Sequence, residues 1–193
     1  MIRTRRSVRQ FQPRAVVESL LTDLVETARW APSPHNSQPW RFIILTPNAK
    51  HRLACAMADR LRADLRQNGV ANDEIEYLAT RSISRIDSAP NALLCATVSE
   101  GLVLTGDPEA DRLERQMAVQ SVGAALQSLF LAAADHDLGT CWMAAPMYCP
   151  EVVRRLLNIP EEWQPQALVL IGYASEPGRI RPRLPLDRVL VIR

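Results

Sequence analysis

The chain has 193 residues, a formal net charge of +2 and 47% hydrophobic residues. This length fits a single domain, 1–193, and so balanced a charge says little about partners. No apolar run approaches the roughly 18 residues of a membrane span, and the N-terminus lacks the apolar core of a secretory signal. We therefore expect a cytoplasmic protein with no membrane partner.

Hydrophobic periodicity predicts helices and strands that alternate without regular βαβ repeats. This pattern favours an α+β fold, with a mostly antiparallel central sheet flanked by helices. In chain order we expect a helix at 15–30, a strand at 41–46, helices at 48–69 and 73–87, a strand at 91–99, a helix at 111–135, a strand leading into a loop at 140–148, a helix at 150–159 and a strand at 166–174.

Three of these segments carry more specific expectations. The helix at 15–30 places six apolar residues on one stripe: Val17, Leu20, Leu21, Leu24, Val25 and Ala28. In the helix at 111–135 Leu113 and seven further apolar residues recur with a period of 3.6, and the stretch SVGAALQSLFLAAA is apolar nearly all round, which suits a central helix or a subunit seam. The proline- and arginine-rich segment 176–193 resembles an extended arm that a compact monomer would have difficulty burying.

No sequence signature of hydrolytic catalysis appears in the chain. There is no GxSxG, P-loop, HExxH or GxGxxG motif, and of the three histidines only His35 lies in a segment worth testing. The four cysteines lack CxxC spacing, so we expect buried free thiols in a reducing compartment. We expect no metal site and no catalytic side chain.

Three stretches share a capacity to bind anions or heterocycles. They are RRSVR at 5–9, PSPHNSQPW at 32–40 and RPRLP at 181–185. Guanidinium groups bind phosphate bidentately, while a proline-stiffened polar loop can meet the edge of a flat ligand at a small entropic cost. Each stretch alone also fits a plainer interpretation: a basic arm that binds nucleic acid, a rigid turn, or exposed surface.

Their order along the chain, with LGTCWMAAP at 138–146, resembles the nitroreductase superfamily of FMN-dependent oxidoreductases. Two stretches, APSPHNSQPWRF and the run WxxAPxxxPExVRxxLxIPxxWxPQALVLIGY, look most like the flavin domain of the glutamate ligase of deazaflavin coenzyme biosynthesis and its free-standing relatives. The resemblance implies an FMN cofactor, a homodimer with a long central dimer helix, and an exchanged C-terminal arm.

The same resemblance assigns residues to the cofactor. Arg9 would stabilise negative charge at the pyrimidine edge of reduced flavin. The loop residues would come from the second subunit, where His35 and Asn36 would also face the substrate. The residues implied at the cofactor are Arg5, Arg6, Ser7, Arg9, Pro32, Ser33, Pro34, His35, Asn36, Ala145, Met147, Arg181 and Arg183.

This chain departs from the family pattern near flavin N5. A backbone N–H from an acidic residue is common there, whereas Pro146 occupies the best-aligned position and has no N–H. Ala145 or Met147 must then supply it. Arg81 and Arg85 match the pyrimidine edge poorly, so we interpret them as a surface helix.

The implied activity passes hydride from a reduced nicotinamide or deazaflavin donor to a small conjugated acceptor by a ping-pong mechanism. Two alternatives stay open. One is the branch of the same superfamily that uses oxygen to break down reduced flavin, and the other is a flavin-free basic module that binds nucleic acid. Yellow colour and the salt dependence of nucleic-acid binding separate these classes.

Overall fold

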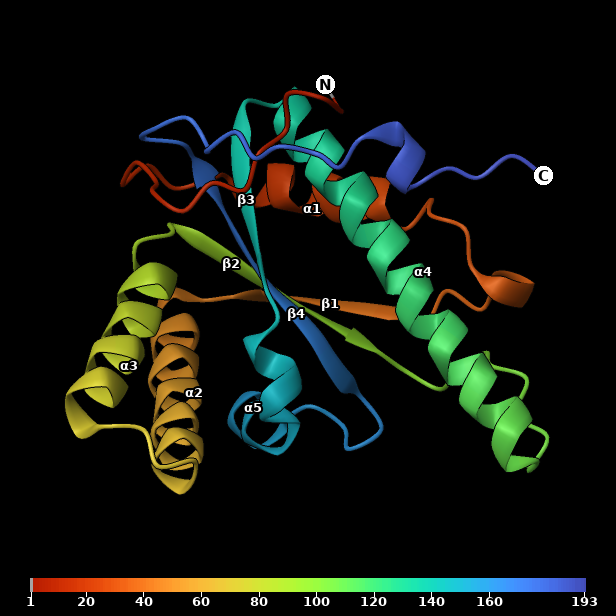
Figure 1. The fold of residues 1–193 in the computed structure, drawn as a ribbon, viewed down its shortest axis with the longest axis horizontal. Coiled ribbons are helices and arrows are strands. Elements are labelled where there is room, and N and C mark those ends of the chain that lie inside the picture. Colours follow the sequence, from red (N-terminus) through yellow and green to blue (C-terminus); the bar gives the residue numbers. More distant parts are fainter. Residues whose placement is uncertain (1) are drawn as a thin grey trace.

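Two almost continuously buried strands, β2 (Asn91–Thr97) and β4 (Gln164–Tyr173), form the centre of the fold. In the computed structural model, which describes residues 2–193, β1 (Trp40–Leu45) pairs with β2, and β3 (Leu138–Met143) pairs with β4. The strand order is β1-β2-β4-β3 and every pairing is antiparallel. The expected α+β fold with an antiparallel sheet is confirmed (Figure 1).

Apolar side chains on both faces of the central strands explain why helices cover the sheet on both sides. Because successive residues of a strand point to opposite faces, Leu168 and Leu170 contact one core, while Val169 and Ile171 contact the other. The helices α1 (Glu18–Ala28) and α4 (Pro108–Asp135) cover the second face. The first face is covered by α2 (Pro47–Gln67), α3 (Asn72–Asp87) and α5 (Pro150–Leu157).

Side-chain caps account for where two of the helices, α2 and α4, begin. Thr46 accepts a hydrogen bond from the Ala49 N–H at 3.2 Å, with Pro47 in the first helical position of α2. Asp107 does the same for α4 by accepting from two backbone N–H groups. In α1 the helix begins one residue after Val17, which is 66% exposed, so the expectation that Val17 joins the buried stripe is wrong.

The long helix α4 packs one stripe on the sheet and leaves the rest of its surface open. Its buried residues include Val122, Leu126 and Leu129, whereas Leu113 is 45% exposed, contrary to its expected place on the apolar face. By length and composition α4 is also apolar enough to cross a bilayer, although no such segment was expected, and 44% of that apolar window is buried. This is weak evidence for a membrane span, because core helices pass the same test.

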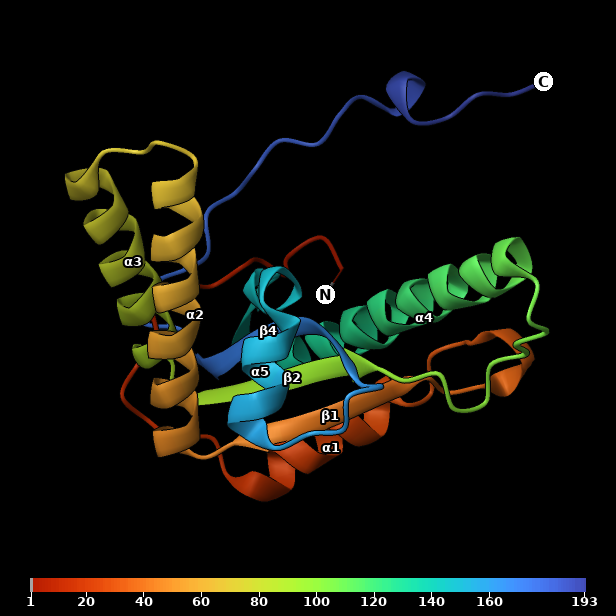
Figure 2. The ribbon, with the colours of Figure 1, turned by 90° about the horizontal axis from the view of Figure 1, so that it is seen from below.

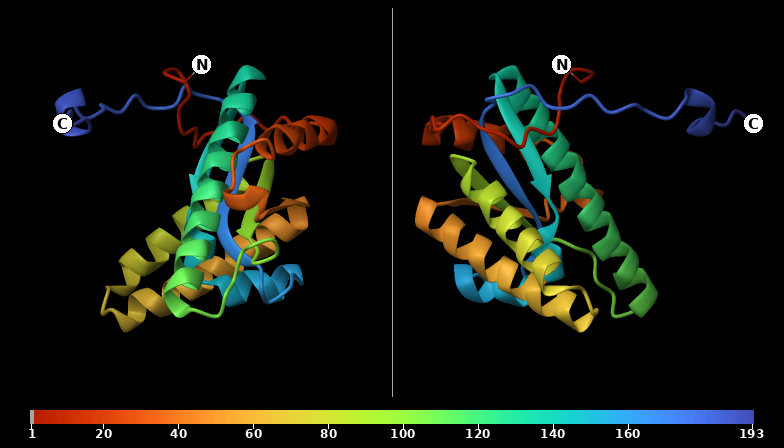
Figure 3. Two further views of the ribbon diagram at one scale, coloured as in Figure 1. Left: turned by 90° about the vertical axis from the view of Figure 1, so that its right-hand side faces the viewer. Right: turned by 60° about the vertical axis from the view of Figure 1, so that its left-hand side comes forward.

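The C-terminal segment leaves the body of the protein. Residues 176–193 contain only one short 3₁₀ helix, η3 (Leu186–Arg188), and nearly all of their side chains are exposed. Figures 2 and 3 show this arm running away from the sheet and its helices. Its apolar side chains, Val191 and Ile192 among them, are largely exposed.

Candidate functional site: a basic pocket between the two ends of the chain

The N-terminal segment lies along the edge of the sheet, where it presents its arginines. The Val8 N–H donates to the Thr140 carbonyl of β3 at 2.9 Å, and the Gln12 N–H donates to the Tyr173 carbonyl of β4 at 2.8 Å. Gly139 makes this approach possible, because a Cβ there would come within 2.6 Å of the Val8 side chain. The extended backbone of residues 5–9 is therefore fixed against β3.

The beginning of the C-terminal arm is held against the same segment. The Ser175 N–H donates to the Gln10 carbonyl at 3.1 Å, and a Cβ on Gly178 would lie 2.4 Å from Arg6 Cβ. So close an approach requires glycine at this point. Arg179, Arg181 and Arg183 follow, so the two ends of the chain place their cations on one side of the protein.

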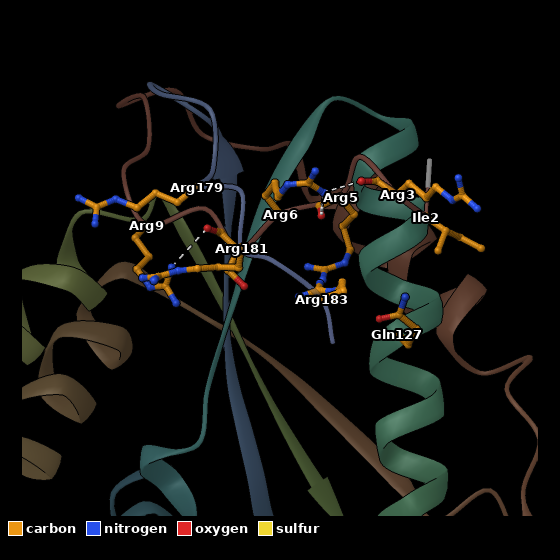
Figure 4. A pocket seen from close by; sticks show the side chains of 10 residues that line it. Ile2, Arg3, Arg5, Arg6, Arg9, Gln127, Arg179, Arg181 and Arg183 are labelled. Carbon is orange, nitrogen blue, oxygen red and sulfur yellow. Dashed lines mark hydrogen bonds between the residues drawn. The ribbon is translucent and has the colours of Figure 1, made fainter. Parts of the chain in front are cut away.

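A pocket of about 680 Å³ lies between these segments, a size typical of small-molecule sites. Figure 4 shows its arginine side chains coming from the N-terminal segment and from the arm. Arg6 donates from Nη1 to the carbonyl oxygens of Arg3 and Arg5, which stabilises the bend of the N-terminal segment. The pocket is lined by Ile2, Arg3, Arg5, Arg6, Ser7, Arg9, Gln127, Arg179, Arg181 and Arg183.

The positive charge of this pocket is not balanced by the protein. Within residues 2–193 no carboxylate lines it, and none of its arginines takes part in an ion pair. Arginines elsewhere do pair: Arg29 with Glu26, Arg62 with Glu76 and Arg112 with Glu109. Clustered cations repel one another unless an anion joins them, so this arrangement fits a phosphate-bearing ligand.

A second pocket of about 690 Å³ adjoins the first and shares Ser7, Arg9, Arg179 and Arg181 with it. Its other wall is one face of α3, where Arg81, Ser84, Arg85 and Ser88 recur at helical spacing. Arg81 is exposed on this helix, as expected, and both Arg81 and Arg85 also line the second pocket. The helical spacing of residues 81, 84, 85 and 88 places their side chains on one face of the helix. That this face lines a pocket becomes visible only from the packing of α3 beside the N-terminal segment.

A buried thiol lies close to these cations. Burial raises the pKa of the Cys141 thiol on β3, and the nearby Arg9 and Arg85 only partly oppose that shift. Cys141 is free, as are Cys55, Cys95 and Cys149. The expectation of buried thiols is confirmed for three of the four, because Cys55 is only partly buried.

The proline-rich loop lies apart from both pockets within one chain. It forms a 3₁₀ turn, η1 (Pro34–Asn36), and the five predicted positions 32–36 line neither pocket. His35, Asn36 and Gln38 have φ values of 54°, 54° and 46°, a left-handed conformation that is costly for residues other than glycine. His35 Nε2 lies 3.7 Å from Glu114 Oε1 of α4.

The segment after β3 bears on which backbone N–H, that of Ala145 or that of Met147, is free to meet flavin N5. Residues Ala145–Tyr148 form a 3₁₀ turn, η2, in which Pro146 is buried. The Met147 N–H already donates to the Ala144 carbonyl at 3.0 Å. Of the two predicted donors, Ala145 is thus the better candidate, although neither residue lines the basic pockets.

The fold and the pocket define an α+β protein with an arginine-lined pocket between the two ends of its chain. The model of the Nitroreductase family matches residues 2–173, and the chain belongs to this family. It is therefore an oxidoreductase enzyme. The family named from the sequence motifs is confirmed.

Curated relatives of the chain carry different names. A 5,6-dimethylbenzimidazole synthase of Rhodobacter capsulatus is 31% identical over 173 residues, covering 89% of this chain and 81% of the relative. An NADH dehydrogenase of Thermus thermophilus is 29% identical over 201 residues, covering 98% and 92%. These names show that similar chains have been assigned more than one reaction.

Solved structures share the fold. A putative nitroreductase of Desulfovibrio desulfuricans in complex with FMN has a TM-score of 0.77 and 23% identity, covering 100% of this chain and 94% of that one. The FMN-dependent nitroreductase NfnB of Mycobacterium smegmatis, in complex with NADPH, has a TM-score of 0.74 and 24% identity, covering 100% and 96%. At these identities the likeness establishes the fold.

Proposed function

We propose that the protein is an FMN-dependent oxidoreductase that works as a homodimer. Hydride passes from a reduced nicotinamide or deazaflavin donor to a small conjugated acceptor in a ping-pong cycle. The observation that supports this proposal most directly is the basic pocket, in which arginines from both chain ends meet without carboxylate partners. Family membership and the FMN named in two structural neighbours support the cofactor.

The residues present fit the phosphate end of FMN. Arg5, Arg181 and Arg183 offer guanidinium groups from two segments, and Ser7 adds a hydroxyl donor. Such charge-assisted hydrogen bonds are the strong ones, and fixing Ser7 against β3 reduces the entropy lost on binding. When bound, FMN supplies the hydride-accepting and hydride-donating chemistry of the reaction.

The adjoining pocket suits the pyrimidine edge of the ring. Arg9 lines both pockets and so joins the phosphate end to the wall formed by α3. Its positive charge, with that of Arg85, stabilises negative charge on a reduced ligand. The Ala145 N–H supplies the hydrogen bond that Pro146 cannot donate.

The proposed second subunit completes the site. Prolines and three left-handed residues keep the loop 32–38 rigid, yet it faces neither pocket of its own chain. In the dimer this loop covers the partner's cofactor, with His35 and Asn36 toward the acceptor. Exposed apolar residues on α4 and on the arm provide the surface for the pairing.

Flavin retention tests the pocket. Protein purified without added cofactor is expected to be yellow and to release FMN on unfolding. In Arg5→Ala/Arg183→Ala, loss of two charge-assisted contacts should weaken FMN binding by roughly 100-fold or more. Arg29→Ala is the matched control, because Arg29 pairs only with Glu26 on an exposed helix. Unchanged FMN affinity in the double variant would refute the phosphate site.

Donor oxidation tests the reaction. Under anaerobic conditions each candidate donor, NADH, NADPH or reduced deazaflavin, is added to the protein in turn, and bleaching of flavin absorbance identifies the competent one. Parallel lines in double-reciprocal plots would support the ping-pong order. Intersecting lines would contradict it and leave the cofactor assignment untouched.

A second function is favoured by one observation, the relative named 5,6-dimethylbenzimidazole synthase. We propose as the alternative an oxygen-dependent breakdown of reduced flavin. Reduced protein exposed to oxygen would then lose its flavin chromophore irreversibly, whereas a nitroreductase-type enzyme would return to the oxidised yellow form. Colourless protein with steeply salt-dependent nucleic-acid affinity would instead favour the basic binding module.

A further inference from the structure

A thiol, an imidazole and a carboxylate form a continuous chain of contacts where α2 meets the end of α3. Cys55 Sγ lies 3.6 Å from His51 Nε2, and His51 Nδ1 lies 2.8 Å from Asp87 Oδ2. Residues 51 and 55 face each other because they are four apart on α2. None of the three lines either basic pocket.

Asp87 determines which nitrogen of the imidazole can accept a proton. A carboxylate at 2.8 Å accepts a hydrogen bond from Nδ1–H, which leaves the lone pair of neutral His51 on Nε2. That nitrogen is the one that faces Cys55 Sγ. The Cys55 thiol, the His51 imidazole and the Asp87 carboxylate thus have the arrangement in which a base, oriented by a third group, activates a nucleophile.

Cys55 is also the accessible thiol of the chain. The other cysteines are buried, and burial raises the pKa of Cys141, of Cys95 and of Cys149, the last to about 11. Cys55 is only partly buried, beside a His51 side chain that is 59% exposed. A reagent in solution can therefore reach Cys55.

Lys50 is a further charged group at this place, and α2 also carries Arg52 and Asp59 within one turn of Cys55. The Lys50 Nζ turns inward and donates to the backbone carbonyl oxygens of Asp87 and Ala89. It therefore leaves the Asp87 side chain to His51, while its charge stands near that carboxylate. Within residues 2–193 no group of His, Cys, Asp and Glu here could hold a metal ion.

We infer that Cys55 is the reactive thiol of this protein and exchanges with small-molecule disulfides. His51 takes the thiol proton on Nε2, and Asp87 stabilises the resulting imidazolium. The thiolate attacks one sulfur of the disulfide, a new S–S bond to Cys55 forms, and the other sulfur leaves as a thiolate. The two sulfur atoms of the reagent supply the oxidising equivalents, so no further reactant is required.

Thiol titration of the full-length protein as isolated tests this site. With 5,5′-dithiobis(2-nitrobenzoate) at pH 7, one thiol per chain should react fast, and peptide mass mapping should locate the adduct on Cys55. The fast phase should vanish in Cys55→Ser. A fast phase that persists in this variant would overturn the assignment.

Exposure of the Cys55 thiol alone would also give a fast reaction, so the role of His51 is tested by the pH dependence of the rate. His51→Gln should slow the reaction about tenfold or more at pH 7, and Asp87→Asn should slow it as well. The rates should converge at about pH 9.5, where ordinary thiols ionise unaided. His136→Gln, a histidine at the end of α4, is the matched control.

The thiol titrations test the role of Cys55 without depending on whether FMN binds. Equal rates at pH 7 in wild type, His51→Gln and Asp87→Asn would show that Cys55 reacts through exposure alone, and the inference would fall. An unfolded variant would reveal itself by fast reaction of all four cysteines. FMN retention should be unchanged in Cys55→Ser, so failure here leaves the proposed function standing.

Discussion

Space for a side chain decides where the N-terminal segment lies, because Val8 packs directly over Gly139. We expect Gly139→Ala to lower the free energy of unfolding by about 1–3 kcal/mol through overpacking, and to weaken FMN retention because Ser7 moves off β3. Denaturant unfolding and flavin fluorescence measure the two effects. Adding Val8→Ala should restore part of the loss, since the new Cβ crowds both γ carbons of Val8. Strictly additive effects would contradict this explanation.

The buried Lys50 side chain leads to a second prediction for a single residue, which concerns how the free energy of unfolding depends on pH. Burial lowers the pKa of Lys50 from 10.5, although Asp87 partly opposes the shift. The folded state therefore loses this proton at lower pH than the unfolded state does. The unfolded state binds more protons in that interval, so the contribution of Lys50 to stability rises with pH up to about 10.5.

The variant Lys50→Met isolates this contribution. The difference in free energy of unfolding, wild type minus Lys50→Met, should increase as the pH rises toward about 10.5, as measured by urea unfolding at a series of pH values. Arg52→Met on the exposed side of α2 serves as the control, and its difference should stay flat over this range, because arginine does not titrate there. A constant difference for Lys50→Met would show that its charge is equally tolerated in both states.

Among the elements, α1 begins without a side-chain cap, and this gives a stabilising prediction. Val17 is the exposed N-cap residue and cannot accept a hydrogen bond from the first turn. Val17→Asp should raise stability by about 1 kcal/mol, and the melting temperature by about 2–4 °C for a chain of this size. Thr46→Ala is the reciprocal variant, because it removes an existing cap from α2 and should lower stability by a similar amount. No gain in Val17→Asp would mean that the start of α1 frays.

The elements were predictable from sequence to within a few residues because their signals are local. Periodicity, Pro47 and Gly69 delimit α2, and the apolar run in β4 identifies a buried strand. The strand order was not predictable, since β4 lies between β2 and β3 and pairs with residues far away in sequence. Exposure of Val17 likewise depends on where the helix begins, which is a matter of one residue.

At the scale of the whole molecule, the site is made of segments from opposite chain ends. Motif order predicted that residues 5–9 and 181–183 would share a ligand, and the structure brings them to one pocket. The role of α3 could not be read from the sequence, because it depends on how Arg85 and Ser88 pack beside the N-terminal segment. The loop 32–36 stays a prediction that only a dimer can test.

The arm carries the last prediction, because its apolar side chains stay largely exposed within residues 2–193. Residues 184–193 include Leu184, Leu186, Val189, Leu190, Val191 and Ile192, all more than half exposed. Deleting 184–193 should leave the secondary structure of the subunit, measured by circular dichroism, nearly unchanged, because no residue of this segment is buried. It should shift the protein from dimer to monomer in light scattering, since burial of apolar area is what a stable dimer needs.

Flavin retention should fall in the same deletion, although Arg181 and Arg183 remain, because nothing then holds them over the pocket. Asp187→Ala/Arg188→Ala, which removes charges from the arm but keeps its apolar residues, should stay dimeric and yellow. A dimer that survives the deletion with its flavin would mean that α4 alone forms the interface, with Leu113 and Val119 on its exposed face. The arm would then serve only as the support of its arginines.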